Sequence, residues 1–142
     1  MLLQKIEGNK YLVVAYVEEA ADGDESIVAL DDLRSLGQKY SGSIKGIISL
    51  FKIYAKYGRM QPDGVTQSHM HHANYEPDIL EFIKGKVRVF CFVDKGGMVV
   101  LTNSGLKKGQ KASSKDVSKA IKVFRKYHSA KLAGDIEFLE KE

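Results

Sequence analysis

The fold is decided by residues 79–103, which read ILEFIKGKVRVFCFVDKGGMVVLTN. This stretch holds three runs rich in β-branched and aromatic residues, which are typical of strands. The runs cover residues 79–84, 86–94 and 98–103. Gly85 and the segment Lys95-Gly96-Gly97 separate them, and both fit the tight turns of β-hairpins. We therefore predict three consecutive antiparallel strands, a meander, at the centre of the protein.

Before the meander, the pattern predicts one strand and two helices. The strand is Tyr11–Glu18, which is apolar on both faces. In the two helices, apolar residues recur every three or four positions, as on the buried side of an amphipathic helix. The first stripe is Ile27, Leu30, Leu33 and Leu36, and the second is Ile44, Ile47, Ile48, Phe51 and Tyr54. Asp24 and Ser43 are the expected N-caps, and Gly37 and Gly58 are the expected ends.

After the meander, a lysine-rich loop leads to a last helix with Ser113 or Ser114 as its expected N-cap. The apolar stripe of this helix is Val117, Ala120, Ile121, Phe124 and Tyr127. The stretch Arg59–Asp78 shows no clean period and is expected to be a loop with at most one short strand. We predict a single α+β domain over residues 1–142, in the order β-α-α-β-β-β-α. Two N-terminal helices pack on a small, mainly antiparallel sheet, and a C-terminal helix follows.

The composition excludes several classes of protein. Apolar residues make up 44% of the chain, which is enough for a real core, and charged residues make up 28%. No apolar run approaches the roughly 20 residues that span a bilayer, and Met1–Lys10 lacks the apolar core of a signal peptide. The single cysteine, Cys91, excludes an internal disulfide and a cysteine-based zinc site. We expect a cytoplasmic protein with no membrane partner.

Positive charge is concentrated in one part of the chain. Residues 84–131 carry 13 Lys and Arg against 2 Asp and Glu, whereas residues 1–83 carry 8 against 12. Such an excess repels itself unless an anion offsets it. Two interpretations remain open: a solvated lysine face that aids solubility, or a site for a polyanion, of which nucleic acid is the most plausible. The candidate residues for binding nucleic acid are Lys84, Lys86, Lys111, Lys115, Lys119, Lys122 and Lys126.

The middle strand of the meander carries a basic pair. Alternation along residues 86–94 places Lys86 and Arg88 on the same face as Phe90 and Phe92, and directs the intervening Val and Cys side chains to the core. The basic and aromatic face is either an exposed strand end or a concave surface on which Arg88 binds phosphate.

A second basic pair, Lys107 and Lys108, lies just past the third strand. If this pair and Arg88 converge on one hollow, three or four cations surround a phosphate there. Clustered cations lower one another's pKa, so that one lysine can act as a base. Tyr127 and His128 end the basic helix, where each has either a structural role or a contact with substrate phosphate.

The segment that contains His69, His71 and His72 resembles a metal site only superficially. A fixed third ligand is missing, because Glu76 and Asp78 are near only in sequence. The chain also lacks the P-loop, G-x-G-x-x-G and G-x-S-x-G motifs. We expect neither a metal nor another cofactor.

Residues 79–103, the loop Lys107-Lys108-Gly109-Gln110-Lys111 and the following helix resemble the RelE/HigB superfamily of toxins from type II toxin–antitoxin systems. The resemblance is closest to the phage-derived Gp49-like branch. The pattern of that branch runs from EF through G-x-x-RVF-x-F and a turn to VVL and a twin-lysine loop. It covers residues 79–128 and departs at Ser104-Gly105-Leu106, where the family has Gly-Phe.

The resemblance implies an mRNA endoribonuclease (an mRNA interferase) that depends on the ribosome and needs no metal. In such an enzyme the ribose 2′-OH attacks the adjacent phosphate, and positive charge stabilises the transition state. The catalytic residues implied by position are Arg88, Lys107, Lys108, Tyr127 and His128. The implied partners are mRNA on the ribosome and a cognate antitoxin, often of the helix-turn-helix type.

Two other functions remain open. One is a catalytically degenerate module with a RelE-type fold that binds RNA or a protein. The other is a toxin similar to ParE, which inhibits gyrase.

Overall fold

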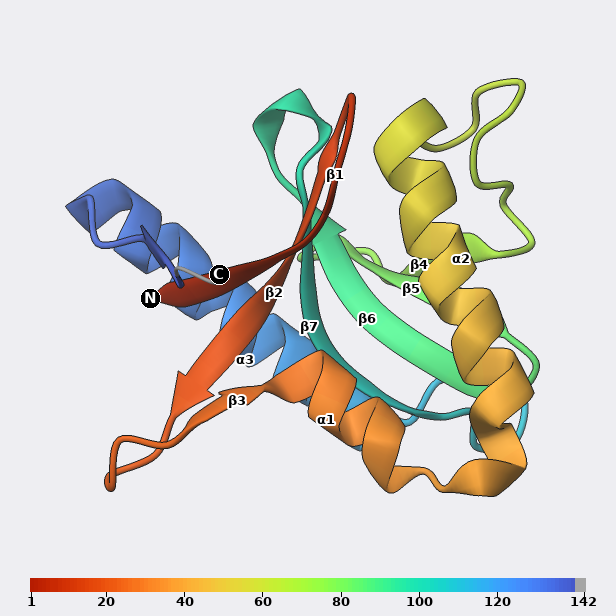
Figure 1. The fold of residues 1–142 in the computed structure, drawn as a ribbon, viewed down its shortest axis with the longest axis horizontal. Coiled ribbons are helices and arrows are strands. Elements are labelled where there is room, and N and C mark those ends of the chain that lie inside the picture. The colour runs from red at the N-terminus through yellow and green to blue at the C-terminus, as the bar shows by residue number, and fades with distance from the viewer. Residues whose placement is uncertain (140–142) are drawn as a thin grey trace.

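The computed structural model describes residues 1–139 (Figure 1). Within that range the chain forms eight strands and three α-helices. The strands are β1 (Leu2–Gly8), β2 (Leu12–Glu19), β3 (Glu25–Ile27), β4 (Met70–Asn74), β5 (Ile79–Lys84), β6 (Val87–Val93), β7 (Val99–Leu106) and β8 (Glu137–Phe138). The helices are α1 (Val28–Ser35), α2 (Ser41–Tyr57) and α3 (Ser114–Ala133). The chain is therefore a mixed α+β protein, as predicted.

The strands form one curved sheet in the order β4-β5-β6-β7-β2-β1-β8, and β3 pairs with β2 beside that path. The predicted meander is confirmed, because β5, β6 and β7 are antiparallel neighbours. Gly85 forms the turn between β5 and β6 at φ 57°, a value that glycine adopts readily. The pairs β2–β7 and β1–β8 are parallel, so the sheet is mainly antiparallel.

Each face of the sheet has its own apolar core. Helices α1 and α2 cover one face, where Phe51 of α2 packs edge-on against Phe82 of β5 at 5.1 Å between ring centroids. Helix α3 covers the other face, where Phe92 and Tyr127 are buried. Because both faces are covered, β6 is an apolar run that is buried from Val87 to Phe92.

This double covering corrects one prediction. Phe90 and Phe92 do not form an open, concave face with Arg88, because α3 buries both aromatic rings. Conversely, Val93 was expected in the core and is 41% exposed at the end of β6. Arg88 lies on the same face as the two aromatics, just beyond the part of the sheet that their core fills.

Two of the predicted helix N-caps, Asp24 and Ser43, are wrong. Asp24 is not an N-cap, because β3 pairs with β2 before α1 begins and the N-cap is Ile27. Ser43 lies inside α2, which begins at Ser41. Ser113 is the N-cap of α3, but its side chain makes no capping hydrogen bond. The predicted order also omitted β1, β3 and β8, whereas β4 is a short strand within the predicted loop.

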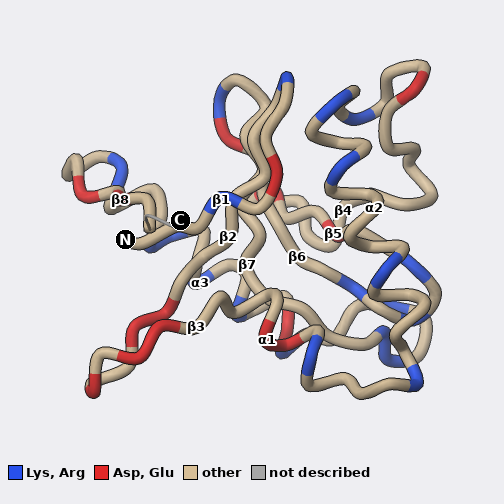
Figure 2. Tube along the Cα trace, in the orientation of Figure 1, with Lys and Arg blue, Asp and Glu red and all other residues tan. Residues whose placement is uncertain are grey.

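Charges are unevenly distributed over this fold. Figure 2 shows Asp and Glu gathered along the connection between β2 and β3, while Lys and Arg gather on α2 and on the loops near the start of β6. The acidic connection contains Glu18, Glu19, Asp22, Asp24 and Glu25. The acidic connection and the basic loops near the start of β6 therefore lie in different parts of the fold.

The C-terminal half of α3 is fixed to the sheet by Asp94, which follows β6. The Tyr127 hydroxyl donates to the Asp94 carboxylate, and the Lys131 ammonium donates to both carboxylate oxygens at 2.9 and 2.7 Å. Burial alone would raise the pKa of Asp94. Hydrogen bonds from Lys131, Tyr127 and the Lys95 N–H outweigh burial and lower the pKa to about 2.

Replacing Asp94 by Asn removes this charge and is expected to lower the free energy of unfolding at neutral pH by about 1–3 kcal/mol. The folded pKa (about 2) lies below the ordinary value of 3.8, so the ionised carboxylate stabilises the fold above about pH 4. This contribution is lost as the pH falls towards 2, and the difference between wild type and variant should shrink over that range. Urea unfolding measures it, with Asp63→Asn in an exposed loop as the control. A difference that stays constant down to pH 2 would contradict the assignment.

Candidate functional site

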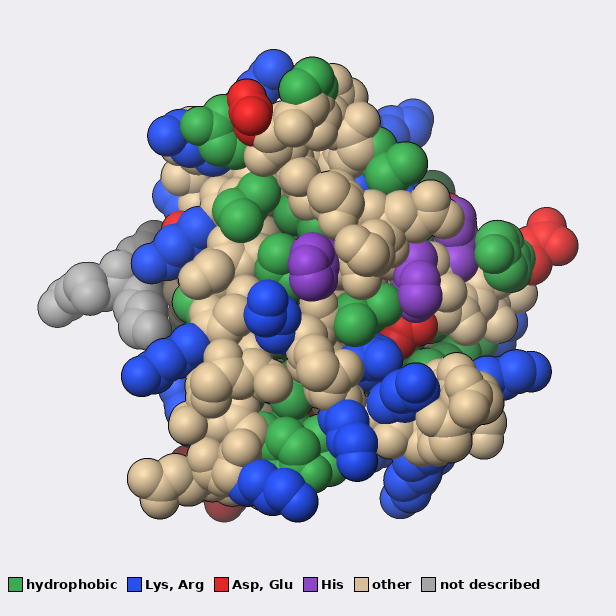
Figure 3. All heavy atoms as spheres, turned by 90° about the vertical axis from the view of Figure 1, so that its right-hand side faces the viewer, with side chains coloured by type: hydrophobic (Ala, Val, Ile, Leu, Met, Phe, Trp, Pro, Cys, Tyr) green, Lys and Arg blue, Asp and Glu red, His purple; other side chains and the backbone are tan. Residues whose placement is uncertain are grey.

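Arg88 and Lys107 meet at one pocket, which we call the Arg88 pocket. Strands β4 to β6, the loop after β7 and the first half of α3 surround a volume of about 740 Å³. The lining includes His71, Glu81, Arg88, Lys107, Lys111 and Ile121. Figure 3 shows this side of the molecule, where His side chains lie among Lys and Arg side chains and acidic side chains are few. The pocket is thus open to solvent and mainly basic.

A buried ion pair forms the floor of the pocket. Arg88 Nε lies 3.1 Å from Glu81 Oε1, and the two side chains are only 10% and 6% exposed. Burial raises the pKa of Glu81 above its ordinary value, and the nearby charges of His71 and Arg88 only partly offset this rise. Burial also lowers the pKa of Arg88, and Glu81 opposes that shift. Burial thus disfavours the charged form of both side chains, and each charge offsets part of this cost for the other.

The Arg88 guanidinium is anchored along one edge and free along the other. Its Nη1 donates to the carbonyl oxygens of Gly85 at 2.7 Å and of Val87 at 3.0 Å, while Nε faces Glu81. Among residues 1–139, no hydrogen bond or ion pair involves Nη2. The two N–H groups of Nη2 thus remain available to an anion in the pocket, on a side chain that is held rigidly.

The loop after β7 brings two lysines to the same pocket. The Lys107 N–H donates to the Lys86 carbonyl at 2.8 Å and so extends the pairing of β6 with β7 by one residue. Leu106, at the point where the sequence departs from the family pattern, packs against the core under α1 and α2. Lys107 and Lys111 line the pocket, whereas Lys108 is exposed and is not among the lining residues. The backbone that carries Lys107 is therefore fixed.

Helix α3 can approach Arg88 because the residue that pairs with Arg88 on the neighbouring strand is a glycine, Gly105. Arg88 pairs with Gly105 of β7, and a Cβ at Gly105 would overlap the Asp116 carboxylate in the first turn of α3. Asn103 of β7 also donates to the Asp116 carbonyl at 3.0 Å. These contacts place the start of α3 over the pocket.

The structure does not bring Tyr127 and His128 into the Arg88 pocket. Tyr127 is 2% exposed and donates to Asp94 near the far end of the sheet. The His128 ring packs on Phe124 at 4.3 Å between centroids. Both residues stabilise the packing of α3.

The predicted RNA-binding lysines also separate in space. Lys111 lines the Arg88 pocket, and Lys86 and Lys115 are exposed in the neighbouring turn and on α3. Lys84 lies instead against α2 at Gly46, and the remaining lysines are on another side of α3. These are Lys119, Lys122 and Lys126, which line a smaller pocket of about 400 Å³.

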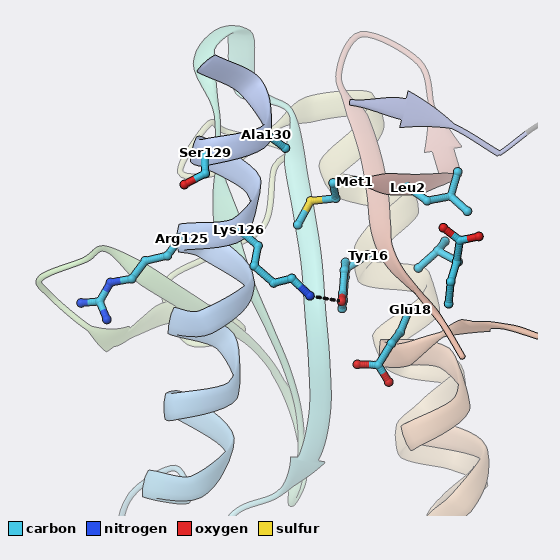
Figure 4. A pocket seen from close by; sticks show the side chains of 10 residues that line it. Met1, Leu2, Tyr16, Glu18, Arg125, Lys126, Ser129 and Ala130 are labelled. Carbon is cyan, nitrogen blue, oxygen red and sulfur yellow. Dashed lines mark hydrogen bonds between the residues drawn. The ribbon is translucent and has the colours of Figure 1, made fainter. Parts of the chain in front are cut away.

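On that side of α3, positive and negative groups face each other. Figure 4 shows Lys126 directed at Tyr16 of β2, with Glu18 close by, and Lys126 Nζ donates to the Tyr16 hydroxyl at 3.0 Å. This hydrogen bond and the nearby charges raise the pKa of Lys126. Asp32 lines the neighbouring pocket beside Lys119. Acidic groups of the same molecule thus already offset part of this positive charge, as Glu81 offsets part of the charge of Arg88 in the Arg88 pocket.

The histidines of β4 and the residue before it take part in separate contacts. His69 Nδ1 lies 3.2 Å from the Ile83 carbonyl oxygen, and His72 Nε2 lies 2.9 Å from Asp78. His71 Nε2 lies 3.4 Å from Glu81 Oε2. Within residues 1–139, no group of three or more potential ligands is arranged to hold a metal ion.

Sequence reasoning missed Glu81 and His71 as parts of the site. Glu81 is the one charged residue in the run Ile79–Ile83, and a carboxylate inside an apolar strand indicates a buried partner. In the predicted β5–β6 hairpin, Glu81 lies diagonally across from Arg88, so the pair could have been found from the register. The position of His71 in the site could not be predicted, because it depends on the register of β4, which the sequence does not define.

The comparisons with known proteins bear on this pocket directly. The sequence model of the phage-derived Gp49-like proteins matches residues 31–125, about two thirds of the chain. The chain belongs to the Gp49-like family. The matched range includes every residue that lines the Arg88 pocket. No curated protein resembles the sequence closely enough to be a match.

Gp49-like proteins are associated with the toxins of toxin–antitoxin systems. Within residues 1–139 of this member, no helix is long and apolar enough to cross a membrane.

In this Gp49-like protein, Arg88→Met would leave the Glu81 carboxylate buried without its nearest cationic partner, at an expected cost of about 3 kcal/mol in the free energy of unfolding. Adding Glu81→Gln removes the buried charge that has lost its partner, so the double variant should be more stable than Arg88→Met alone. Urea unfolding of wild type, both single variants and the double variant measures this coupling. A double variant less stable than Arg88→Met would show that the two side chains do not act as an ion pair.

Proposed function

We propose that this Gp49-like chain is a toxin of the RelE/HigB type, a single-domain endoribonuclease that cleaves mRNA on the ribosome without a metal ion. One observation carries the proposal. A rigid arginine with two free N–H groups shares one pocket with Lys107 and Lys111. Such a set of fixed donors and charges suits a phosphate.

These residues suit RNA cleavage by internal attack. When a ribose 2′-oxygen attacks the adjacent phosphorus, the phosphate gains negative charge in the transition state, and preorganised cations stabilise it. In the proposed mechanism, Arg88 Nη2 donates to a non-bridging oxygen, and Lys107 and Lys111 supply further positive charge. The products are a 2′,3′-cyclic phosphate and a free 5′-hydroxyl.

The other basic residues would guide the RNA strand to the pocket. Lys86, Lys108 and Lys115 are exposed near its rim and would contact neighbouring phosphates, with a dependence on salt. Tyr127 and His128 would act indirectly in this proposal, by holding α3 in place. The proposed place of action is the cytoplasm, where mRNA is translated.

Membership of a toxin–antitoxin family makes an antitoxin the expected protein partner. We propose that this partner is of the helix-turn-helix type and that it suppresses the activity.

A binding module without catalysis is the second candidate. The observation that favours it is the Glu81 carboxylate, which neutralises part of the charge of Arg88. This candidate predicts RNA binding that weakens roughly tenfold or more over a fourfold rise in salt concentration, with no cleavage product. A gyrase inhibitor similar to ParE would instead leave translation intact and induce DNA damage signals.

Expression of the wild-type protein should arrest growth, and primer extension on mRNA after brief induction should reveal new 5′ ends. The double variant Arg88→Lys with Lys107→Ala keeps a positive charge beside Glu81 but loses the free N–H fork and one cation of the pocket. It should abolish the new ends. Lys52→Ala with Lys56→Ala removes two exposed charges of α2 as a control for net charge and should leave the new ends unchanged. If the Arg88→Lys, Lys107→Ala variant arrests growth as strongly as wild type, the catalytic assignment is wrong.

A further inference from the structure

The contacts of Glu81 extend beyond Arg88 to a histidine on the edge strand. His71 of β4 and Glu81 of β5 are directly opposite in the antiparallel register. Their side chains meet with Nε2 and Oε2 3.4 Å apart. The Glu81 carboxylate thus faces Arg88 with one oxygen and His71 with the other.

The side chains of Glu81 and His71 differ in their access to solvent. The Glu81 side chain is 6% exposed, whereas the His71 side chain is 45% exposed and lines the Arg88 pocket. A buried carboxylate beside an accessible imidazole is the arrangement by which hydrolytic enzymes orient a histidine. Because Nε2 is the ring nitrogen that lies 3.4 Å from Glu81, a proton on Nε2 would leave Nδ1 of the neutral ring as the nitrogen that can accept a proton.

The other histidines lack this arrangement. His72 also borders the pocket, but its partner Asp78 is 64% exposed, and its ring stacks on Tyr75. His69 lies against a backbone carbonyl oxygen. Only the contact of His71 joins a histidine to the carboxylate that also anchors Arg88, among the residues that the structure describes.

We propose that His71 is the general base of the reaction and that Glu81 is the positioning residue that orients it, an inference that rests on the proposed RNA cleavage. His71 Nδ1 takes the proton of the ribose 2′-OH while the 2′-oxygen forms its bond to phosphorus. The bond from phosphorus to the 5′-oxygen breaks, and that oxygen leaves as a hydroxyl with a proton from water. The imidazolium, held by Glu81, then returns its proton to solvent. No oxidant, reductant or metal is needed for this balance.

This assignment explains why one pocket contains both acidic and basic groups. Lys107, Lys111 and Arg88 surround the phosphate, and a proton acceptor is still required next to the 2′-OH. Lysines are ordinarily protonated at neutral pH, whereas a free imidazole is ordinarily mostly neutral there. His71 is therefore the better base at physiological pH.

The first test is single-turnover cleavage of mRNA bound to purified ribosomes, with product quantified by primer extension. His71→Ala should lower the rate by about 100-fold or more, while binding to the programmed ribosome stays within about threefold of wild type. Added imidazole should restore part of the lost rate, because a free base can enter the space left by the side chain. His69→Ala, two residues away and outside the lining of the pocket, is the matched control and should cleave at the wild-type rate.

Glu81→Gln tests the positioning role. It should lower the cleavage rate, and imidazole should not rescue it, since His71 still occupies the site. Urea unfolding of each variant separates this effect from a loss of fold. Asp78→Asn alters the exposed partner of His72 instead and serves as the control for removing a carboxylate from this edge.

A substrate with sulfur in place of the 5′-bridging oxygen at the mapped cleavage site separates a base from an acid. Its leaving group needs no proton, so His71→Ala should remain slow on this substrate, and recovery to the wild-type rate would overturn the role as base. Wild-type rates for His71→Ala on ordinary mRNA would overturn the inference and leave the proposed function intact, provided that Arg88→Lys with Lys107→Ala is inactive. If the wild-type protein yields no product, the proposed function and this inference fall together.

Discussion

The ion pair between Glu81 and Arg88 is the interaction on which the site depends. Two charges lie where the apolar core under α3 gives way to the pocket, and neither could be buried there alone at an acceptable cost. Because Glu81 and two backbone carbonyls hold Arg88, the orientation of its free edge is determined before any ligand arrives. Preorganisation of this kind reduces the cost of ordering a binding group.

The covering of both faces of the sheet explains why the charged groups of β6 lie near its ends. Both faces of β6 are covered along most of its length, so its charged groups lie at its two ends, with Arg88 where α3 begins and Asp94 just after the strand. Gly105 permits this start of α3 to lie close to β7. The same helix that closes the core thus supplies one wall of the pocket.

Local features of the fold could be predicted from the sequence, whereas long-range ones could not. The meander follows from turn residues and strand propensity within 25 residues, and the stripe of α2 follows from its period. The parallel pairs β1–β8 and β2–β7 join segments far apart in sequence, and no local signal specifies them. Asp24 failed as a cap because pairing of β3 with β2 overrides the local preference of that residue.

The same distinction applies to the candidate site. Arg88 and Lys107 belong to one continuous motif, and their shared pocket follows from the meander and the loop after it. The contact of His71 with Glu81 required the register of an edge strand that has no clear pattern. Tyr127 and His128 are near the lysine face in sequence, but the length of α3 carries them away from the pocket.

Helix α3 contacts the sheet at two distant points. Its 20 residues span about 30 Å, from the mouth of the pocket to the Asp94 clamp at the opposite end. Because α3 is one continuous helix, the residues that contact Asp94 and the part of the pocket wall that contains Ile121 belong to the same rigid element. The position of one wall of the pocket therefore depends in part on a carboxylate at the opposite end of the helix.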